Sequence, residues 1–153
     1  MPTDTPARLQ GCTSFKVRQM MRLVSQHFDA ELGKAGLKTT QYSLLMHVAG
    51  LGPSRPAALA QAMRMDASTL SRNLKPLVDA GWVRVQPGPD QRSRSVVLTE
   101  AGRLKRDAAQ RHWRAAQDKI NRMLGIERVR ALHALIDDSL ALLSCDDQGA
   151  HDE

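Results

Sequence analysis

Aromatic side chains are scarce in this sequence of 153 residues, because Phe, Trp and Tyr together make up only 3% of it. Leu, Val, Ile, Met and Ala must therefore fill the core, which suits helices packed on helices better than a β-sandwich. Hydrophobic residues at 42% and charged residues at 25% are close to the averages of globular domains, so we do not expect a disordered chain. The length predicts a single domain.

Cysteine is also rare, and its two occurrences, Cys12 and Cys145, lie near opposite ends of the chain. They form neither a CxxC pair nor a Cys/His ligand spacing, which argues against a disulfide framework and a structural zinc site. No HxxxH pair occurs among the five histidines, which are His27, His47, His112, His133 and His151. We therefore expect no metal and no cofactor.

Long hydrophobic runs are missing as well, and no stretch approaches the length of about 18 residues that a transmembrane helix needs. The first residues, MPTDTPARLQ, lack the apolar centre of a secretory signal. We therefore expect a cytoplasmic protein that does not associate with membranes. The sequence has no GxSxG elbow, phosphate-binding loop, dinucleotide glycine fingerprint or HExxH motif, so we do not expect an enzyme.

Positive charge is concentrated in the middle of the chain. The formal net charge is +6, with an isoelectric point near 9.9. Residues 55–114 contain twelve Lys or Arg against five Asp or Glu, whereas residues 126–153 contain two against seven. A concentrated basic region attracts polyanions such as nucleic acids. Charge alone favours an ordinary solvated surface over a nucleic-acid site, so the motifs have to decide between the two.

The first half of the chain has the apolar spacing of helices. Apolar residues recur every three or four positions over residues 15–32, which predicts an amphipathic helix that ends within residues 33–36. A second helix is expected to follow, capped by Thr39 or Thr40. After a stretch with two glycines and two prolines, a short helix is predicted over residues 56–63.

A further helix is predicted after Asp66, which has the side chain of a helix N-cap. One side of it is apolar and consists of Leu70, Leu74, Leu77 and Val78. The opposite side is polar and cationic and consists of Ser68, Ser71, Arg72 and Lys75. Two Val-rich segments around the turn-prone PGPDQR then predict a β-hairpin, and two long helices are expected after Thr99.

This order of elements, a helix, a short helix, a cationic helix and a hairpin, is that of a winged helix-turn-helix. A helix fits the major groove of DNA, and the side chains placed to contact base edges are Ser68, Thr69, Ser71 and Arg72. Lys75 is placed to contact a phosphate. At the hairpin tip, Asp90 is expected to steady one arginine while Arg92 or Arg94 enters the minor groove, where the negative potential favours arginine.

Four segments between Leu37 and Gly102 resemble the multiple antibiotic resistance regulator (MarR) family. They are LAQ in the short helix, STLSRNLKPLVDAGWV in the cationic helix, DQRSR at the hairpin tip and LTEAG at the start of the next helix. The resemblance implies a mainly α fold with a small β-wing and with a dimerisation layer of N- and C-terminal helices. It also implies a homodimer on palindromic double-stranded DNA that usually represses nearby genes and is often released by a small ligand or an oxidant.

The resemblance also implies roles for particular residues. It assigns Ser68, Thr69, Ser71 and Arg72 to the major groove. It also implies that Thr40 and Gln41 reach phosphate. Effectors of the family bind between the dimerisation layer and the winged region, where the candidates are His27, Tyr42, His47 and Trp113, unless these are ordinary core residues. One branch senses peroxides through a cysteine, but the matching position here is Ser14 and not Cys12, which argues against such sensing.

The expected organisation has five parts. Residues 10–36 and 99–143 would form the helical dimerisation region, residues 37–98 the DNA-binding region, and residues 1–9 and 144–153 flexible ends. A winged helix that binds another protein is the alternative hypothesis, because a fold does not by itself determine a function. The basic residues gathered on one side of the winged region favour DNA.

Overall fold

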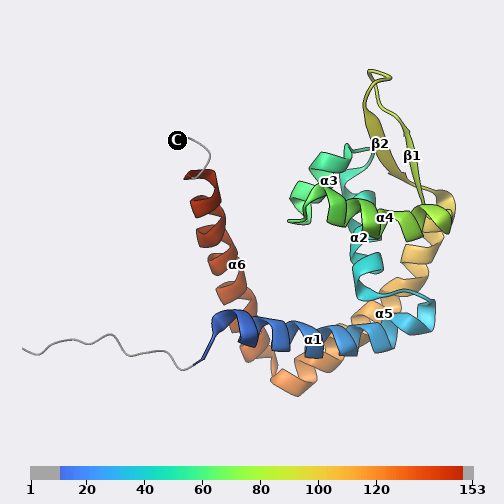
Figure 1. Cartoon of the computed structure of the whole chain (residues 1–153). Helices are drawn as coiled ribbons and strands as arrows, with labels where there is room; N and C mark the ends of the chain where they lie inside the picture. The colour runs from blue at the N-terminus through green and yellow to red at the C-terminus, as the bar shows by residue number, and fades with distance from the viewer. Residues whose placement is uncertain (1–10, 150–153) are drawn as a thin grey trace, which may run out of the picture. The chain divides into compact units, whose positions relative to one another are not determined.

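The computed structural model describes residues 11–149, and it divides into two compact units after Trp113. Figure 1 labels the helices and strands along the chain. In order, they are α1 (Thr13–Leu32), a short 3-10 helix η1 (Gly33–Ala35), α2 (Thr39–Leu51), α3 (Pro56–Ala62), α4 (Ala67–Asp79), β1 (Val83–Pro87), β2 (Arg94–Leu98), α5 (Glu100–Leu124) and α6 (Ile126–Gly149). This confirms the predicted mainly α fold with a small β-wing.

The core of the first unit is built from aliphatic side chains, as the shortage of aromatic residues predicts. Helix α2 is its central element and contacts α1, α3, α4 and β2. The largest fully buried side chains are Leu32, Leu44, Leu45, Leu59, Leu70, Leu77, Val48, Val83 and Val96. These residues come from six different elements, so the winged region folds around one continuous hydrophobic core.

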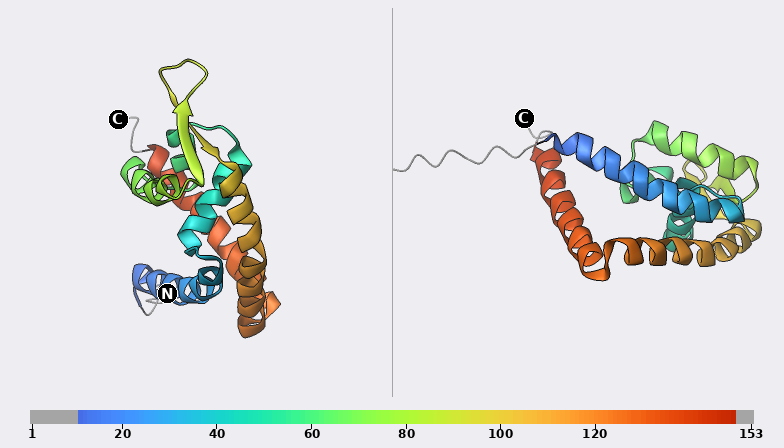
Figure 2. Two further views of the ribbon diagram at one scale, coloured as in Figure 1. Left: turned by 90° about the vertical axis from the view of Figure 1, so that its right-hand side faces the viewer. Right: turned by 90° about the horizontal axis from the view of Figure 1, so that it is seen from below.

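Helices α3 and α4 form the helix-turn-helix pair, and the hairpin β1–β2 extends beyond them (Figures 1 and 2). Helix α3 begins with Pro56, whose missing N–H costs nothing in a first turn. Helix α4 begins after Asp66, as predicted, and Gly81 follows its end with a positive φ of 76°. One residue of the predicted apolar side is not in the core: Val78 is exposed, because it lies beside the buried row rather than in it.

The wing is an antiparallel hairpin in which Val85 pairs with Val96. Ser54 extends this pairing on the other side of β2, since its N–H donates to the carbonyl of Val96 and its carbonyl accepts from the N–H of the same residue. The tip is closed by a hydrogen bond of 2.7 Å from Gly88 N to Ser93 O. The hairpin is therefore fixed at its base and closed at its end.

Thr99 connects the base of the wing to the start of α5. Its backbone N–H donates to the carbonyl of Trp82, and its hydroxyl donates to the carbonyl of Gly81 over 2.6 Å. The same hydroxyl oxygen accepts from the N–H of Gly102, which satisfies one donor in the first turn of α5. Lys105 adds a cation–π contact, with Nζ 4.9 Å from the centre of the Trp82 ring.

Helix α2 corrects one prediction about its start. Its N-cap position is Lys38, so Thr39 and Thr40 both lie inside the helix rather than capping it. Asp29, on α1, takes over the capping role, because one of its carboxylate oxygens accepts hydrogen bonds from both the N–H and the hydroxyl of Thr39. The cap comes from another helix, which no local sequence pattern reveals.

The second unit consists of the remainder of α5 and of α6. Helix α6 continues to Gly149, so the expectation that a flexible tail starts at residue 144 is wrong for residues 144–149. The expectations for residues 1–9 and 150–153 lie outside the described residues. Between residues 11 and 149, no helix is both long and apolar enough to span a membrane.

Candidate nucleic-acid interface

The first turn of α4 is organised around the carboxylate of Asp66. Its Oδ1 accepts hydrogen bonds of 2.7 Å from the backbone N–H of Thr69 and from the hydroxyl of Ser68, and its Oδ2 accepts one of 2.8 Å from the hydroxyl of Thr69. These bonds, led by the one from the Thr69 backbone, lower the pKa of Asp66 from 3.8 to about 2. Asp66 is therefore ionised at neutral pH and holds two of the predicted DNA-contacting side chains.

The next turns of α4 present the other predicted residues at the surface. Ser71, Arg72 and Lys75 are all exposed. The Arg72 Nη2 lies 3.4 Å from the Thr69 hydroxyl oxygen, to which it donates. Lys75 is paired with Asp79 one turn later, with Nζ and Oδ2 2.8 Å apart. An exposed pair of this kind contributes little to stability, so Lys75 can change partners at small cost.

The wing tip differs in one respect from the prediction. Asp90 does not steady an arginine of the hairpin; it accepts hydrogen bonds from the hydroxyl and the N–H of Ser93, and its Oδ2 lies 3.6 Å from Arg55 Nη2. These contacts, the Ser93 hydroxyl first, lower the pKa of Asp90. Arg92 and Arg94 are exposed, and neither makes a hydrogen bond or ion pair with the described part of the chain.

A groove of about 520 Å³ lies between α3, α4 and the hairpin, and we call it the α4–wing groove. Ser71, Arg72 and Lys75 line it from α4, and Arg94 lines it from β2. Residues separated by about twenty positions in the sequence thus share one concave surface, on which three basic side chains lie among apolar ones such as Leu70 and Val78. Arg92 and Asp90 at the tip are not among the lining residues.

The start of α2 contains the two remaining predicted DNA contacts. Thr40 is exposed. Gln41 turns back along its own helix, where its Oε1 accepts a 2.9 Å hydrogen bond from the N–H of Lys38. This local bond uses the carbonyl oxygen of Gln41, whereas a phosphate, which can only accept, would bind the NH₂ group of the same side chain.

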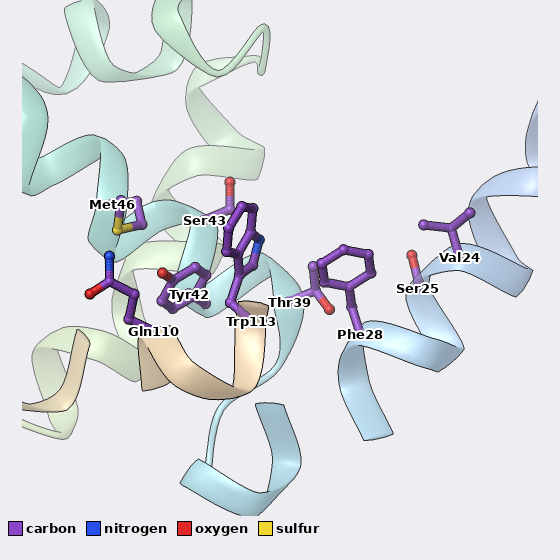
Figure 3. A pocket seen from close by; sticks show the side chains of 9 residues that line it. All are labelled: Val24, Ser25, Phe28, Thr39, Tyr42, Ser43, Met46, Gln110 and Trp113. Carbon is purple, nitrogen blue, oxygen red and sulfur yellow. The ribbon is translucent and has the colours of Figure 1, made fainter. Parts of the chain in front are cut away.

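A second hollow lies between α1, α2 and α5, and we call it the helical cavity (Figure 3). Its volume is about 450 Å³. The Tyr42 and Trp113 rings line it in a stacked arrangement, with centroids 6.4 Å apart and planes inclined by 25°. The other lining residues, Val24, Ser25, Phe28, Thr39, Ser43, Met46 and Gln110, are uncharged as well.

Only two of the four predicted effector residues line the helical cavity. His27 is not among the lining residues, and neither is His47, whose Nδ1 lies 2.8 Å from the Ser43 carbonyl of its own helix. The polar residues that do line it, such as Gln110, carried no recognisable sequence signal. Their faces on α1, α2 and α5 meet only in the folded chain.

Across the described residues, His, Cys, Asp and Glu side chains do not gather in groups of three that could hold a metal ion. Cys12 is an exposed free thiol at the N-cap of α1, and Ser14 is exposed in the first turn of the same helix. That Cys12 does not sense peroxides stays a prediction.

The sequence motifs did not point to two further arginines near this surface. Arg55 precedes α3 and reaches the wing tip through Asp90, and Arg84 is exposed on β1, where its Nη2 donates to Gln86. Arg84 could have been found, because it alternates with the inward-facing Val83 and Val85 in a predicted strand. The Arg55 contact spans 35 positions and needs the fold.

Comparison with known proteins shows to which family this architecture belongs. The helix-turn-helix pair and the hairpin together define the winged helix-turn-helix fold. A family model described as MarR family matches residues 35–93. The chain belongs to the MarR family.

Several relatives are similar over most of their length. The transcriptional regulator MosR of M. tuberculosis, in a crystal structure with DNA, is 30% identical, with a TM-score of 0.74 over 87% of this chain and 98% of that one. A probable transcriptional regulator from Pseudomonas aeruginosa is 26% identical, with a TM-score of 0.77 over 86% and 98%. An uncharacterized HTH-type transcriptional regulator of Bacillus subtilis, YwoH, is 30% identical over 59% of this chain and 66% of its own length.

Proposed function

We propose that this chain is a sequence-specific DNA-binding transcriptional regulator that acts in the cytoplasm as a homodimer. In this proposal it represses genes by binding a pseudo-palindromic operator, with one α4 in each of two major grooves and one wing in each flanking minor groove. The relative MosR was crystallised with DNA, which supports a DNA partner for this chain.

The observation that carries the proposal is the α4–wing groove. It combines Arg72 and Lys75 of α4 with Arg94 of β2 on one concave surface, next to the exposed side chains of Ser68 and Ser71. Cations around a concave site attract phosphate, and hydroxyl and guanidinium groups are suited to base edges. Arg92, which has no partner in the described part of the chain, extends the positive surface to the wing tip.

A homodimer is supported by apolar side chains that each unit leaves in water. On α1, Phe15 is 57% exposed and Met21 60% exposed, although the helix has an amphipathic pattern. On α6, Leu142 and Leu143 are exposed to 73% and 69%. Large exposed apolar patches mark association surfaces, and a second copy of the chain is the partner that family membership favours.

A protein-binding winged helix is the competing function, and the charge of the groove argues against it. A surface that binds another protein has no need to direct Arg72, Lys75 and Arg94 into one groove, whereas a polyanion requires it. Arg84 and Arg92 on the same hairpin strengthen the argument.

Selection from a random pool of DNA duplexes tests the proposal. We expect enrichment of a pseudo-palindromic sequence whose half-sites are about one helical turn apart. Arg72→Ala should then weaken binding to the enriched duplex by about 1–3 kcal/mol if Arg72 contacts a base edge. Arg111→Ala on α5 removes the same charge from an exposed position outside the groove and serves as the control. A pool without any enriched sequence would refute the proposal.

We further propose that a small molecule releases the regulator by occupying the helical cavity. The stacked rings of Tyr42 and Trp113 suit a flat aromatic molecule, and the hydroxyl and amide groups of Ser25, Thr39 and Gln110 suit a ligand with a few polar atoms. Among the described residues, no charged side chain lines the cavity, so an ionised ligand would lose hydration there without gaining a partner. We therefore expect the ligand to be neutral.

Tryptophan fluorescence tests this second part. Trp82→Phe leaves Trp113 as the single tryptophan, inside the cavity. Benzyl alcohol should change its emission and weaken DNA binding, while benzoate at the same concentration should do neither. Trp113→Phe, with only Trp82 remaining, is the matched control. If benzoate acts as strongly as benzyl alcohol, the ligand is not selected for neutrality.

A further inference from the structure

We propose that Asp66 sets the hydrogen-bonding polarity of the recognition helix. It accepts hydrogen bonds from the hydroxyls of Ser68 and Thr69, so that both oxygens face DNA as acceptors and select adenine or cytosine, the two bases that present an amino group in the major groove. The inference rests on the proposed function, because it concerns the same helix and the same DNA.

The direction of the Ser68 bond follows from the charge of its partner. A hydroxyl has a single proton, and an ionised carboxylate can only accept. Ser68 Oγ and Asp66 Oδ1 are 2.7 Å apart, so the proton of Ser68 points at the carboxylate. The N–H of Thr69 donates to the same carboxylate and helps to lower the pKa of Asp66 to about 2. The carboxylate is therefore ionised at neutral pH. A charge-assisted hydrogen bond of this kind is stronger than one between neutral groups.

The direction of the Thr69 bond is fixed from both sides. A guanidinium group can only donate, and Arg72 Nη2 lies 3.4 Å from Thr69 Oγ1. The hydroxyl therefore accepts from Arg72 and donates to Asp66 Oδ2, 2.8 Å away. Both hydroxyls therefore donate to Asp66 before DNA binds. Each oxygen can then offer DNA only a lone pair, that is, it can only accept a hydrogen bond.

This commitment restricts what the two residues can bind in DNA. Phosphate oxygens, N7 of both purines, O6 of guanine and O4 of thymine are acceptors and cannot pair with a lone pair. The donors in the major groove are the N6 amino group of adenine and the N4 amino group of cytosine. The carboxylate of Asp66 also repels phosphate, which works against a backbone contact at this turn.

The recognition helix is thereby divided into two chemical parts. Its first turn accepts through Ser68 and Thr69, and the following turns donate through Arg72 and Lys75 into the α4–wing groove. Guanine or phosphate suits the donating part, because both offer acceptors. The operator should therefore place adenine or cytosine under the first turn of α4 in each half-site.

Base analogues that lack one amino group test the proposal. In the duplex enriched from the random pool, each adenine of a half-site is replaced by purine, which keeps N7 and loses the N6 amino group. Each cytosine is replaced by pyrimidin-2-one, which loses the N4 amino group. We expect one or two positions per half-site at which affinity falls about tenfold for the native protein. Ser68→Ala or Thr69→Ala should remove the sensitivity at one of these positions and leave the other analogue effects unchanged.

Asp66→Asn tests whether the carboxylate is the cause. Asparagine is also a good N-cap, so the helix should be retained, which thermal melting followed by circular dichroism checks. Its side chain has one carbonyl oxygen and an NH₂ group, so at least one hydroxyl loses its acceptor and becomes free to donate. The analogue sensitivity should shrink, and binding to scrambled DNA should tighten because a negative charge is removed.

Asp79→Asn is the matched control for that charge. Asp79 lies at the other end of α4 and pairs with Lys75. Its replacement should tighten binding to scrambled DNA without changing the analogue sensitivity. If no analogue weakens binding, or if Ser68→Ala and Thr69→Ala both keep the full sensitivity, the hydroxyls turn away from Asp66 on DNA and the proposal is wrong. Failure to enrich any sequence would instead overturn the proposed function.

Discussion

Gly102 offers a direct test of how the wing is attached to α5. A Cβ at this position would lie 2.0 Å from the carbonyl oxygen of Trp82 and 2.8 Å from its carbonyl carbon. Real Cβ atoms essentially never approach other heavy atoms closer than 3.0 Å. The two nearest obstructing atoms belong to the backbone, so Gly102→Ala must displace the base of the wing from α5.

Two effects of opposite sign determine the size of the change. Alanine is favoured over glycine inside a helix by about 1 kcal/mol. Extra carbon in a closely packed site costs about 1–3 kcal/mol, and sometimes more. Because the overlap is with a carbonyl group that also accepts from Thr99 N, we expect the steric cost to dominate and the net loss to be about 2 kcal/mol. For a chain of this length, the melting temperature should fall by about 4–8 °C.

Gly50→Ala provides the matched control. Gly50 is also helical, in α2, but apart from its chain neighbours and the nearby backbone of its own helix, no atom lies within 4 Å of the position that its Cβ would take. The same substitution should therefore raise stability there, by up to about 1 kcal/mol. Both variants are melted at one protein concentration, because association would make the midpoint depend on concentration. A Gly102→Ala variant as stable as the native chain would refute the close approach of α5 to the wing.

Three further predictions concern the DNA contacts, the α4 cap and the dimer. The logarithm of the DNA association constant falls linearly with the logarithm of the salt concentration, and Arg92→Ala should make this slope shallower by about 1 if Arg92 contacts one phosphate. DNA titrations at several salt concentrations measure the slope. Folding lowers the pKa of Asp66, so its carboxylate should stabilise the fold fully above about pH 3.8 and lose this contribution as the pH falls towards 2. In urea unfolding, the free energy of unfolding of Asp66→Asn should therefore depend less on pH in that window than that of the native chain. Met21→Glu should shift the chain towards monomer in sedimentation equilibrium, because it places a charge in the proposed dimer surface.

The local elements could be predicted from the sequence because their signals lie within a few residues of each other. Asp66 caps α4 through bonds to Ser68 and Thr69, two and three positions away, and the stripe of Leu70, Leu74 and Leu77 repeats with the helical period. The hairpin follows from alternating valines on either side of a turn. In such segments, local preference and tertiary structure agree.

The remaining features depend on contacts between distant segments. Asp29 caps α2 from another helix, and Arg55 rather than Arg92 faces Asp90 at the wing tip. The end of α6 was placed too early, because its apolar pattern stops at Leu143, whereas the helix continues through weak helix formers to Gly149. In the candidate site, the sequence predicted Tyr42 and Trp113 of the helical cavity but included two histidines that do not line it.

The central claim is that two chains bind one operator through α4 and the wing. Its most direct test titrates the protein into the enriched duplex and into a scrambled duplex of equal length and composition, at two salt concentrations, with the mass of the complex determined by sedimentation. We expect two chains per enriched duplex, clear preference over the scrambled duplex, and affinity that falls with salt. Equal affinity for both duplexes, or saturation at one chain per duplex, would contradict it.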